Sequence, residues 1–226
     1  MEEKSLSIAF ANSLTEESIS CISEFAEIGL DTIMEDGILK DIPIISTAIS
    51  LYKIGSSIKE RHNLKKLLIF LNEINKGIVG EEKLKKYREK FQSNEKFRNQ
   101  EIEYLLVLID RYIDYDKPQM LAKLYLAYLD GIIFWEELIK YAEVIDRFLI
   151  GDLQELQKGA QYDLHYQKSS DALLRLASLG LVVEHSKGFE VNNTCGSLSL
   201  PDLQQKDYEI TMFGNKLIKI LSNMEA

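Results

Sequence analysis

The sequence predicts a mainly α protein in which an antiparallel helical bundle, residues 1–158, is followed by a small C-terminal α+β module, residues 159–226. The 226 residues include only 3 Pro and 12 Gly, so long uninterrupted helices are allowed. Ile, Leu, Lys and Glu dominate, which favours helix over a sheet rich in Val and Thr. Apolar residues recur at helical spacing through most of the chain, and β-type patterns are confined to the C-terminal module.

The first predicted helix begins near Ser13, because Ser13-Leu14-Thr15-Glu16 fits a capping box. A second helix begins at Asp41, a good N-cap, with Pro43 in the first turn, where its missing amide costs nothing. A third has apolar residues at helical spacing and Gly77 as its stop. The apolar positions of this third helix are Leu64, Leu67, Leu68, Leu71 and Ile74.

Residues 42–52 contain no charge, which makes them unusual in the front half of the chain. Eleven residues are too few for a membrane-spanning helix, which needs about 20. We expect a central core helix surrounded by its neighbours. The alternative is a membrane-inserting or partner-binding helix with a basic flank that suits anionic lipid. The residues that would carry the alternative are Ile42, Ile45, Ile49, Tyr52 and Lys53.

Four further helices complete the predicted bundle. Residues 81–98 are highly charged, with a thin apolar stripe. The next helix has its inner face at Ile102, Leu105, Leu106, Ile109, Tyr112 and Ile113, and ends near residues 115–118. A helix over 119–129 and the turn Asp130-Gly131 follow. The last spans 135–156, with Leu138, Ile139, Ala142, Ile145, Leu149 and Leu153 inward.

The C-terminal module begins with a helix that Ser170 or Asp171 caps and Gly180 stops. A β-ribbon, LVVEHSKGFEV, and a strand near 208–211 follow, and MFGNKLIKILSN closes the chain as a helix. The helix that ends Leu-Ala-Ser-Leu-Gly-Leu-Val (176–182), the ribbon and the closing Tyr-Glu-Ile-Thr-Met-Phe-Gly-Asn-Lys-Leu-Ile (208–218) resemble a winged-helix domain over roughly 160–222. That resemblance implies a fold rather than a function, because winged helices serve protein contacts as well as DNA.

If the module bound DNA, the helix 169–179 would enter the major groove. The basic residues available to it are Lys168, Arg175 and Lys187. Nearby acidic side chains, among them Asp171 and Glu184, oppose phosphate, so the surface is poor in the contacts that give affinity. Residues 59–98 carry 12 basic and 6 acidic side chains within a chain of net charge −9, and we interpret them as a solvated helical face.

A helical bundle with a tail of the form Y-x-I/L-T-x-F-G is also similar to the bacterial abortive-infection alpha family, which is linked to phage resistance. The residues that carry this similarity are Tyr208, Ile210, Thr211, Phe213 and Gly214. The resemblance implies a setting in phage defence or a mobile element. It transfers no functional residues to this chain.

Candidate catalytic and metal-binding motifs are incomplete. His62, His165 and His185 have no second His at i+3 or i+4 and no Cys nearby, so we expect no zinc site and no cofactor. Asp130-Gly131 with Glu137 has the spacing of the end of an EF-hand loop, but the first two ligand positions fall on Leu126 and Tyr128. We therefore expect a helix–turn–helix connection there.

These observations predict a non-enzymatic protein-interaction protein, an adaptor or effector with a protein partner. A winged-helix DNA-binding regulator and a membrane-acting effector through residues 42–58 stay open as alternatives, as does homo-oligomerisation. The acidic N-terminus, MEEKSLSIAF, is not a secretory signal, and two separated cysteines fit a reducing compartment, so we expect a cytoplasmic location.

Overall fold

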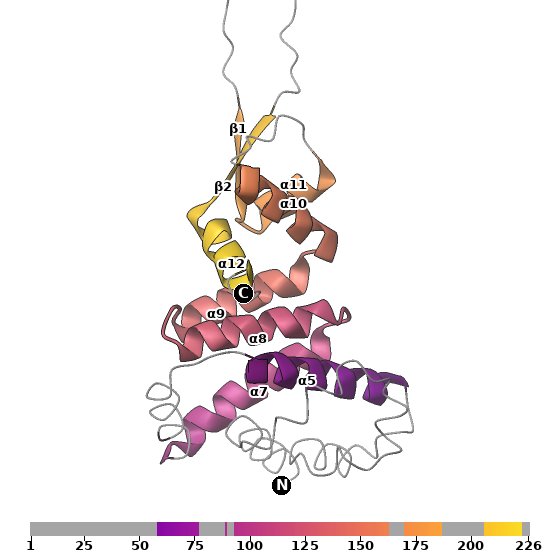
Figure 1. Ribbon diagram of the computed structural model, residues 1–226, viewed down its shortest axis with the longest axis vertical. Helices are drawn as coiled ribbons and strands as arrows, with labels where there is room; N and C mark the ends of the chain where they lie inside the picture. The colour runs from indigo at the N-terminus through magenta and orange to yellow at the C-terminus, as the bar shows by residue number, and fades with distance from the viewer. Residues whose placement is uncertain (1–57, 77–88, 90–92, 163–169, 187–205, 223–226) are drawn as a thin grey trace, which may run out of the picture. The chain divides into compact units, whose positions relative to one another are not determined.

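The computed structural model describes residues 58–76, 89, 93–162, 170–186 and 206–222 (Figure 1). Contacts divide the chain into two compact units, an N-terminal unit that ends at Asp146 and a C-terminal unit that begins at Arg147. The described part is mainly helical, and its small antiparallel sheet lies in the C-terminal unit, which confirms the predicted fold class. The helices predicted before residue 58 and the hydrophobic run 42–52 lie outside the described residues.

The N-terminal unit contains four described helices. They are α5 (Ile58–Lys76), α7 (Glu95–Arg111), α8 (Asp116–Leu129) and α9 (Trp135–Arg147), whose last residue passes the division. Helix α5 packs against α8 and, over a shorter stretch, against α7 (Figure 1). The predicted inner face of α5 is confirmed, because Leu64, Leu67, Leu68 and Leu71 are buried. Helix α8 is the centre of the unit, with every residue from Leu121 to Ala127 buried.

Helix α7 ends earlier than the sequence predicts, and this changes which residues face inward. Its last helical hydrogen bond runs from the Tyr112 amide to the Leu108 carbonyl at 3.2 Å. The Lys66 ammonium then donates to the carbonyls of Asp110 at 2.8 Å and Tyr112 at 2.6 Å. These bonds satisfy acceptors that a helix end leaves open. The expectation that Ile113 faces inward is wrong, since Ile113 lies beyond the helix and is 81% exposed.

The predicted single helix over 135–156 is two helices. Helix α9 ends at Arg147, and a separate helix, α10 (Ile150–Tyr162), follows. The Asp152 carboxylate accepts from the Leu149 amide at 3.4 Å, and the Asp152 amide donates back to the Leu149 carbonyl at 2.9 Å. This reciprocal cap leaves Leu149 exposed rather than inward. The expected boundary at 158 falls inside α10, whereas the units divide after Asp146.

The C-terminal unit combines α10, α11 (Asp171–Ser178), β1 (Val182–Ser186), β2 (Lys206–Ile210) and α12 (Met212–Ser222). Strands β1 and β2 pair antiparallel, with a register that runs from Val182 opposite Ile210 to Ser186 opposite Lys206. Helix α10 packs against α11, α12 and β2, and α11 packs against β1. The buried side chains that fill this unit include Leu156, Leu173, Leu176, Tyr208, Leu217 and Leu221.

Local caps in the C-terminal unit follow the sequence signals. Ser170, in extended conformation, accepts from the Leu173 amide at 3.2 Å, so Ser170 rather than Asp171 is the N-cap of α11. Gly180 follows the helix with a φ of 73°, which a residue with a side chain adopts at a cost. Thr211 caps α12 by accepting from the Gly214 amide at 3.0 Å and also donates to the Gly180 carbonyl at 2.8 Å. This residue therefore ties the sheet to both flanking helices.

Candidate interaction site

Arg175 is the one predicted site residue that lies within the described part of the chain, and its side chain is already paired. Its guanidinium donates two hydrogen bonds to Asp152, Nε to Oδ2 at 2.8 Å and Nη2 to Oδ1 at 2.6 Å. The hydrogen bonds from Arg175 lower the pKa of Asp152, and the same contact raises the pKa of the guanidinium. This bidentate pair joins α10 to α11, so the arginine serves packing within the unit.

The other predicted site residues lie outside the described part of the chain. They are Lys168 and Lys187 for nucleic acid, and Ile42, Ile45, Ile49, Tyr52 and Lys53 for the membrane or partner helix. Both interpretations stay predictions. On the described ribbon, the His185 Nε2 lies 3.1 Å from Glu209, and the Tyr208 hydroxyl donates to Glu184 at 3.2 Å, so acidic side chains occupy this surface.

The turn between α8 and α9 presents two large apolar side chains to solvent. Ile132 is 57% exposed and Phe134 is 74% exposed. Gly131, with a φ of 72°, closes α8 in a Schellman motif, in which the Gly131 amide donates to Tyr128 at 3.0 Å and the Ile132 amide donates to Ala127 at 2.9 Å. Backbone hydrogen bonds thus fix the turn, and Ile133, between the two exposed residues, is buried.

The same turn begins α9 with a side-chain cap. The Glu137 carboxylate accepts from the Phe134 amide at 3.1 Å, and the Glu137 amide donates to the Phe134 carbonyl at 3.1 Å. This is the helix–turn–helix connection that the sequence predicted in place of a calcium loop. The apolar pair that it exposes was not singled out in the sequence, although Gly131 and Glu137 are the signals that fix the turn.

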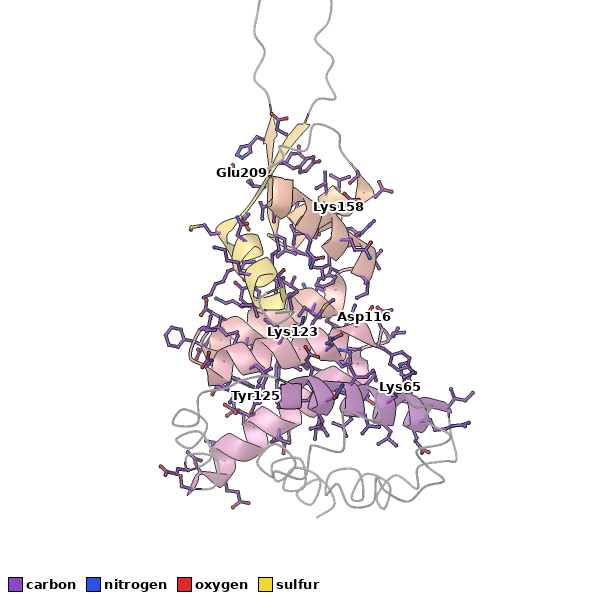
Figure 2. All side chains as sticks on the ribbon, viewed as in Figure 1. Lys65, Asp116, Lys123, Tyr125, Lys158 and Glu209 are labelled. Carbon is purple, nitrogen blue, oxygen red and sulfur yellow. The ribbon has the colours of Figure 1, made fainter. Side chains whose placement is uncertain are left out.

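An aromatic cluster supports the turn from within the N-terminal unit. The ring centroid of Trp135 lies 5.4 Å from that of Tyr128 and 5.7 Å from that of Tyr104. Behind them Glu101 is buried and accepts from the Tyr128 hydroxyl at 2.6 Å. Burial, and then the hydrogen bond to Glu101, raise the pKa of Tyr128. Tyr125, at the core position labelled in Figure 2, has no exposed surface and lies 5.9 Å from Tyr128 between ring centroids.

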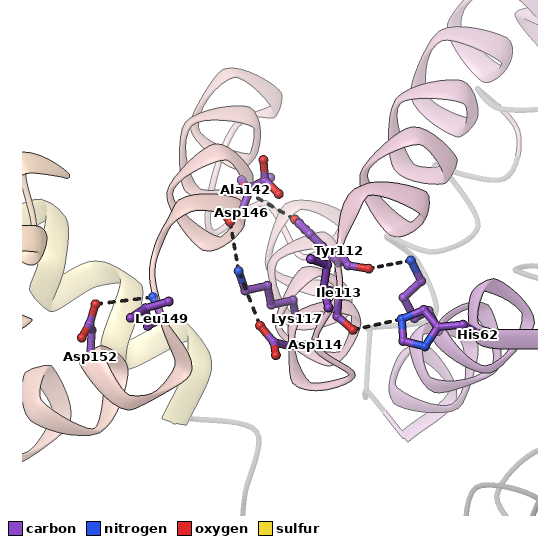
Figure 3. A network of polar contacts seen from close by, with 10 residues as sticks. His62, Tyr112, Ile113, Asp114, Lys117, Ala142, Asp146, Leu149 and Asp152 are labelled. Carbon is purple, nitrogen blue, oxygen red and sulfur yellow. Dashed lines mark hydrogen bonds and ion pairs between the residues drawn. The ribbon is translucent and has the colours of Figure 1, made fainter. Parts of the chain in front are cut away.

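A polar cluster elsewhere in this unit stabilises the junction between α7 and α8 (Figure 3). His62 on α5 uses both ring nitrogens, at 2.8 Å from the Tyr115 hydroxyl and 3.0 Å from the Ile113 carbonyl. Lys66 is buried, and this burial lowers the pKa of its ammonium. Lys117 donates to the Asp146 carbonyl at 2.9 Å. These contacts hold helix ends and loops together, which is a structural use of residues that otherwise suit catalysis.

The described residues contain neither a cluster of metal ligands nor a membrane-spanning helix. Among them, no three His, Cys, Asp or Glu side chains gather in a way that could hold a metal ion. No helix in the described ranges is both long enough and apolar enough to cross a bilayer. No protein-family model matches the chain, and no curated protein or solved structure matches it either.

Proposed function

We propose that this chain is a non-enzymatic protein-interaction protein and that the α8–α9 turn is part of its docking surface. The observation that carries the proposal is the exposure of Ile132 and Phe134 on a turn whose backbone is fixed. A single exposed apolar residue is common on protein surfaces. Two on one rigid turn, beside a half-buried Trp135, form the kind of preorganised apolar anchor that protein partners bury.

The fixed turn matters energetically because binding costs free energy when it orders side chains and loops. Gly131 and Glu137 already hold the turn in one conformation, so a partner would not have to order it. An apolar side chain moved from water into a partner's pocket contributes about 25 cal/mol per Å² of buried surface. The turn therefore offers binding free energy with little conformational cost.

The test is crosslinking of the full-length chain to its neighbours in cells, compared with the double variant Ile132→Ser and Phe134→Ser. We expect a discrete crosslinked partner with the wild-type chain and its loss with the double variant. The matched control is Met212→Ser, which removes another exposed apolar side chain, on α12. Equal recovery of the partner by all three proteins would contradict a docking role for the turn.

A second candidate function, DNA binding, is favoured by the order α11, β1, β2 and α12 in the C-terminal unit, which has the succession of a winged-helix domain. The pairing of Arg175 with Asp152 reduces the charge that α11 offers to phosphate. Fluorescence polarisation with a random-sequence duplex tests this function directly. Binding that weakens steeply with salt would support it, and no binding at low salt would exclude it.

The setting in phage defence and the action of residues 42–58 on membranes stay predictions from the sequence. Flotation with anionic liposomes tests the membrane function, and protein that stays at the bottom of the gradient excludes it. Replacing Ile45 and Ile49 with Asn separates the two interpretations of that segment. Unfolding of this variant would mark both residues as core.

A further inference from the structure

Three side-chain contacts place α7 and α9 next to each other and fix their relative direction. Tyr104 meets Trp135, with ring centroids 5.7 Å apart, near the start of α9. At the end of α7, its last residue Arg111 pairs with Asp146, and the hydroxyl of the next residue, Tyr112, donates to the Ala142 carbonyl at 3.3 Å (Figure 3). Because later residues of α7 meet later residues of α9, the two helices run in the same direction.

An apolar strip follows the outer side of this helix pair. Val107 lies one turn beyond Tyr104 on α7 and is 57% exposed. Ile139 lies one turn beyond Trp135 on α9, and Tyr104, Trp135 and Ile139 are all half-buried. The exposed side chains of Ile132 and Phe134 lie at the start of α9, and the Arg111–Asp146 ion pair lies at the other end. We call these six apolar residues the α7–α9 face. Trp135 and Ile139 span about one turn of α9, about 6 Å at 1.5 Å per residue, and Tyr104 and Val107 span about one turn of α7. Ile132 and Phe134 extend the face into the turn before α9.

The exposed charges beside the α7–α9 face are mostly acidic. Glu103 is exposed on α7, next to Tyr104 in sequence. Glu136 and Glu143 are exposed on the outer side of α9, with Lys140 between them. The Arg111 and Asp146 charges are paired with each other. The surroundings of the strip therefore carry a net negative charge, which repels phosphate and anionic lipid and attracts a cationic partner.

We propose that the α7–α9 face binds a basic amphipathic helix of a partner protein. This inference rests on the proposed function and names the chemistry of the partner. A face of about one turn on each helix, extended by the apolar turn before α9, fits successive anchors at i and i+3 or i+4 on the apolar side of such a helix. Lys or Arg side chains flanking these anchors would lie beside Glu103, Glu136 and Glu143. The carboxylates make this occupant a better match than nucleic acid or an anionic membrane.

The test uses the single tryptophan of the chain, since Trp135 lies in the proposed face. The probe is the synthetic peptide LKKLLKLLKKLLKLLKKL, which has no aromatic residue and places Leu and Lys on opposite faces of a helix. Titration into the full-length protein should shift the Trp135 emission to the blue as the ring is covered. Circular dichroism should show that the peptide becomes helical in the same concentration range.

Matched variants test whether the peptide binds at the α7–α9 face or elsewhere on the surface. Val107→Asp places a charge within the α7–α9 face and should weaken peptide binding about tenfold or more. The control Ile113→Asp changes an exposed apolar residue beyond the end of α7, 81% exposed against 57% for Val107, and should bind as the wild-type protein does. Because both side chains are exposed in the folded protein, both variants should fold. Glu103→Lys combined with Glu136→Lys should also weaken binding and reduce its dependence on salt.

Several outcomes would overturn the inference. These are no emission shift with the wild-type protein, equal affinities for Val107→Asp and Ile113→Asp, or equal binding of a peptide with Glu in place of every Lys. Sedimentation that shows a wild-type dimer and a Val107→Asp monomer would assign the face to a second copy of the chain instead. If the crosslinked partner depends on Ile132 and Phe134 while the peptide fails to bind, the proposed function stands and the basic-helix inference fails.

Discussion

Both carboxylate oxygens of Asp152 accept hydrogen bonds from Arg175, one from Nε and one from Nη2, and the two residues differ sharply in how far they are buried. The side chain of Asp152 is 3% exposed, whereas that of Arg175 is 43% exposed. A charge with access to water tolerates the loss of its partner better than a buried charge does. The pair therefore stabilises the contact of α10 with α11 mainly by satisfying the carboxylate.

Replacing Arg175 should consequently cost more stability than replacing Asp152. Arg175→Met leaves a buried carboxylate without its strongest donors, and we expect a loss of about 3 kcal/mol. Asp152→Asn leaves a guanidinium that water can reach and keeps an acceptor for the Leu149 amide, so we expect about 1 kcal/mol. Hydrogen exchange of the α10 and α11 amides measures both values. Equal losses would mean that burial of the carboxylate does not decide the cost.

The stabilisation from this pair should depend on pH in a defined direction. Hydrogen bonds from Arg175 lower the pKa of Asp152 in the folded protein below its unfolded value. The contribution is therefore complete above the unfolded pKa and is lost as the pH falls through the folded pKa. We expect the difference in unfolding free energy between wild type and Asp152→Asn to shrink as the pH falls below the unfolded pKa of the aspartate and through its lowered folded pKa. A difference that grows on acidification would contradict the assignment.

Gly214 and Gly151 form a matched pair for a test of close packing in the C-terminal unit. A Cβ at Gly214 would collide with the Leu181 carbonyl oxygen, which belongs to the rigid backbone before β1. We expect Gly214→Ala to cost about 3 kcal/mol. A Cβ at Gly151, in the first turn of α10, meets nothing within 4 Å, so Gly151→Ala should gain about 0.5 kcal/mol. Thermal unfolding of the two variants provides the comparison.

Lys66 should be far more important for stability than its neighbour Lys65. Lys66 is buried and donates to two carbonyls at the end of α7, so Lys66→Met leaves both acceptors without this donor and should cost about 2 kcal/mol. Lys65 lies over the Tyr115 ring at 4.4 Å from the centroid, a contact worth about 0.5 kcal/mol when exposed. Urea denaturation of Lys66→Met and Lys65→Met tests the difference. Similar midpoints would show that the cap is dispensable.

Helical periodicity predicted the elements well where local signals decide the structure. The buried face of α5 and the Ser170 cap of α11 follow from spacing and capping residues that are adjacent in sequence. The end of α7 was predicted wrongly because Lys66, about 45 residues away, closes it. The break at Leu149 was not predicted because apolar periodicity continues across it. From the sequence, Asp152 fits an exposed position within one helix as well as it fits the cap of a new helix.

The candidate interaction site was harder to predict because it depends on tertiary contacts. The exposure of Ile132 and Phe134 depends on the Schellman turn at Gly131 and on the Glu137 cap. Gly131 and Glu137 are local signals that the sequence itself shows. The position of Val107 relative to α9 cannot be predicted from the sequence, because it follows from the Tyr104–Trp135 contact between segments distant in the chain. Likewise, nothing local to Arg175 indicates that Asp152 pairs with it.

Variants of the α8–α9 turn should show whether its apolar residues serve partner binding or the stability of the fold. Ile132 and Phe134 are exposed, so Ile132→Ser with Phe134→Ser should change the unfolding free energy by no more than about 0.5 kcal/mol. Gly131→Ala forces a side chain to adopt a φ of 72° and should cost about 1 kcal/mol, although a Cβ there meets no neighbour within 4 Å. Chemical denaturation measures both changes, and crosslinking measures the partner. Partner loss in the serine variant with unchanged stability is the expected signature of a docking surface, whereas parallel loss of both would make the apolar pair a structural feature.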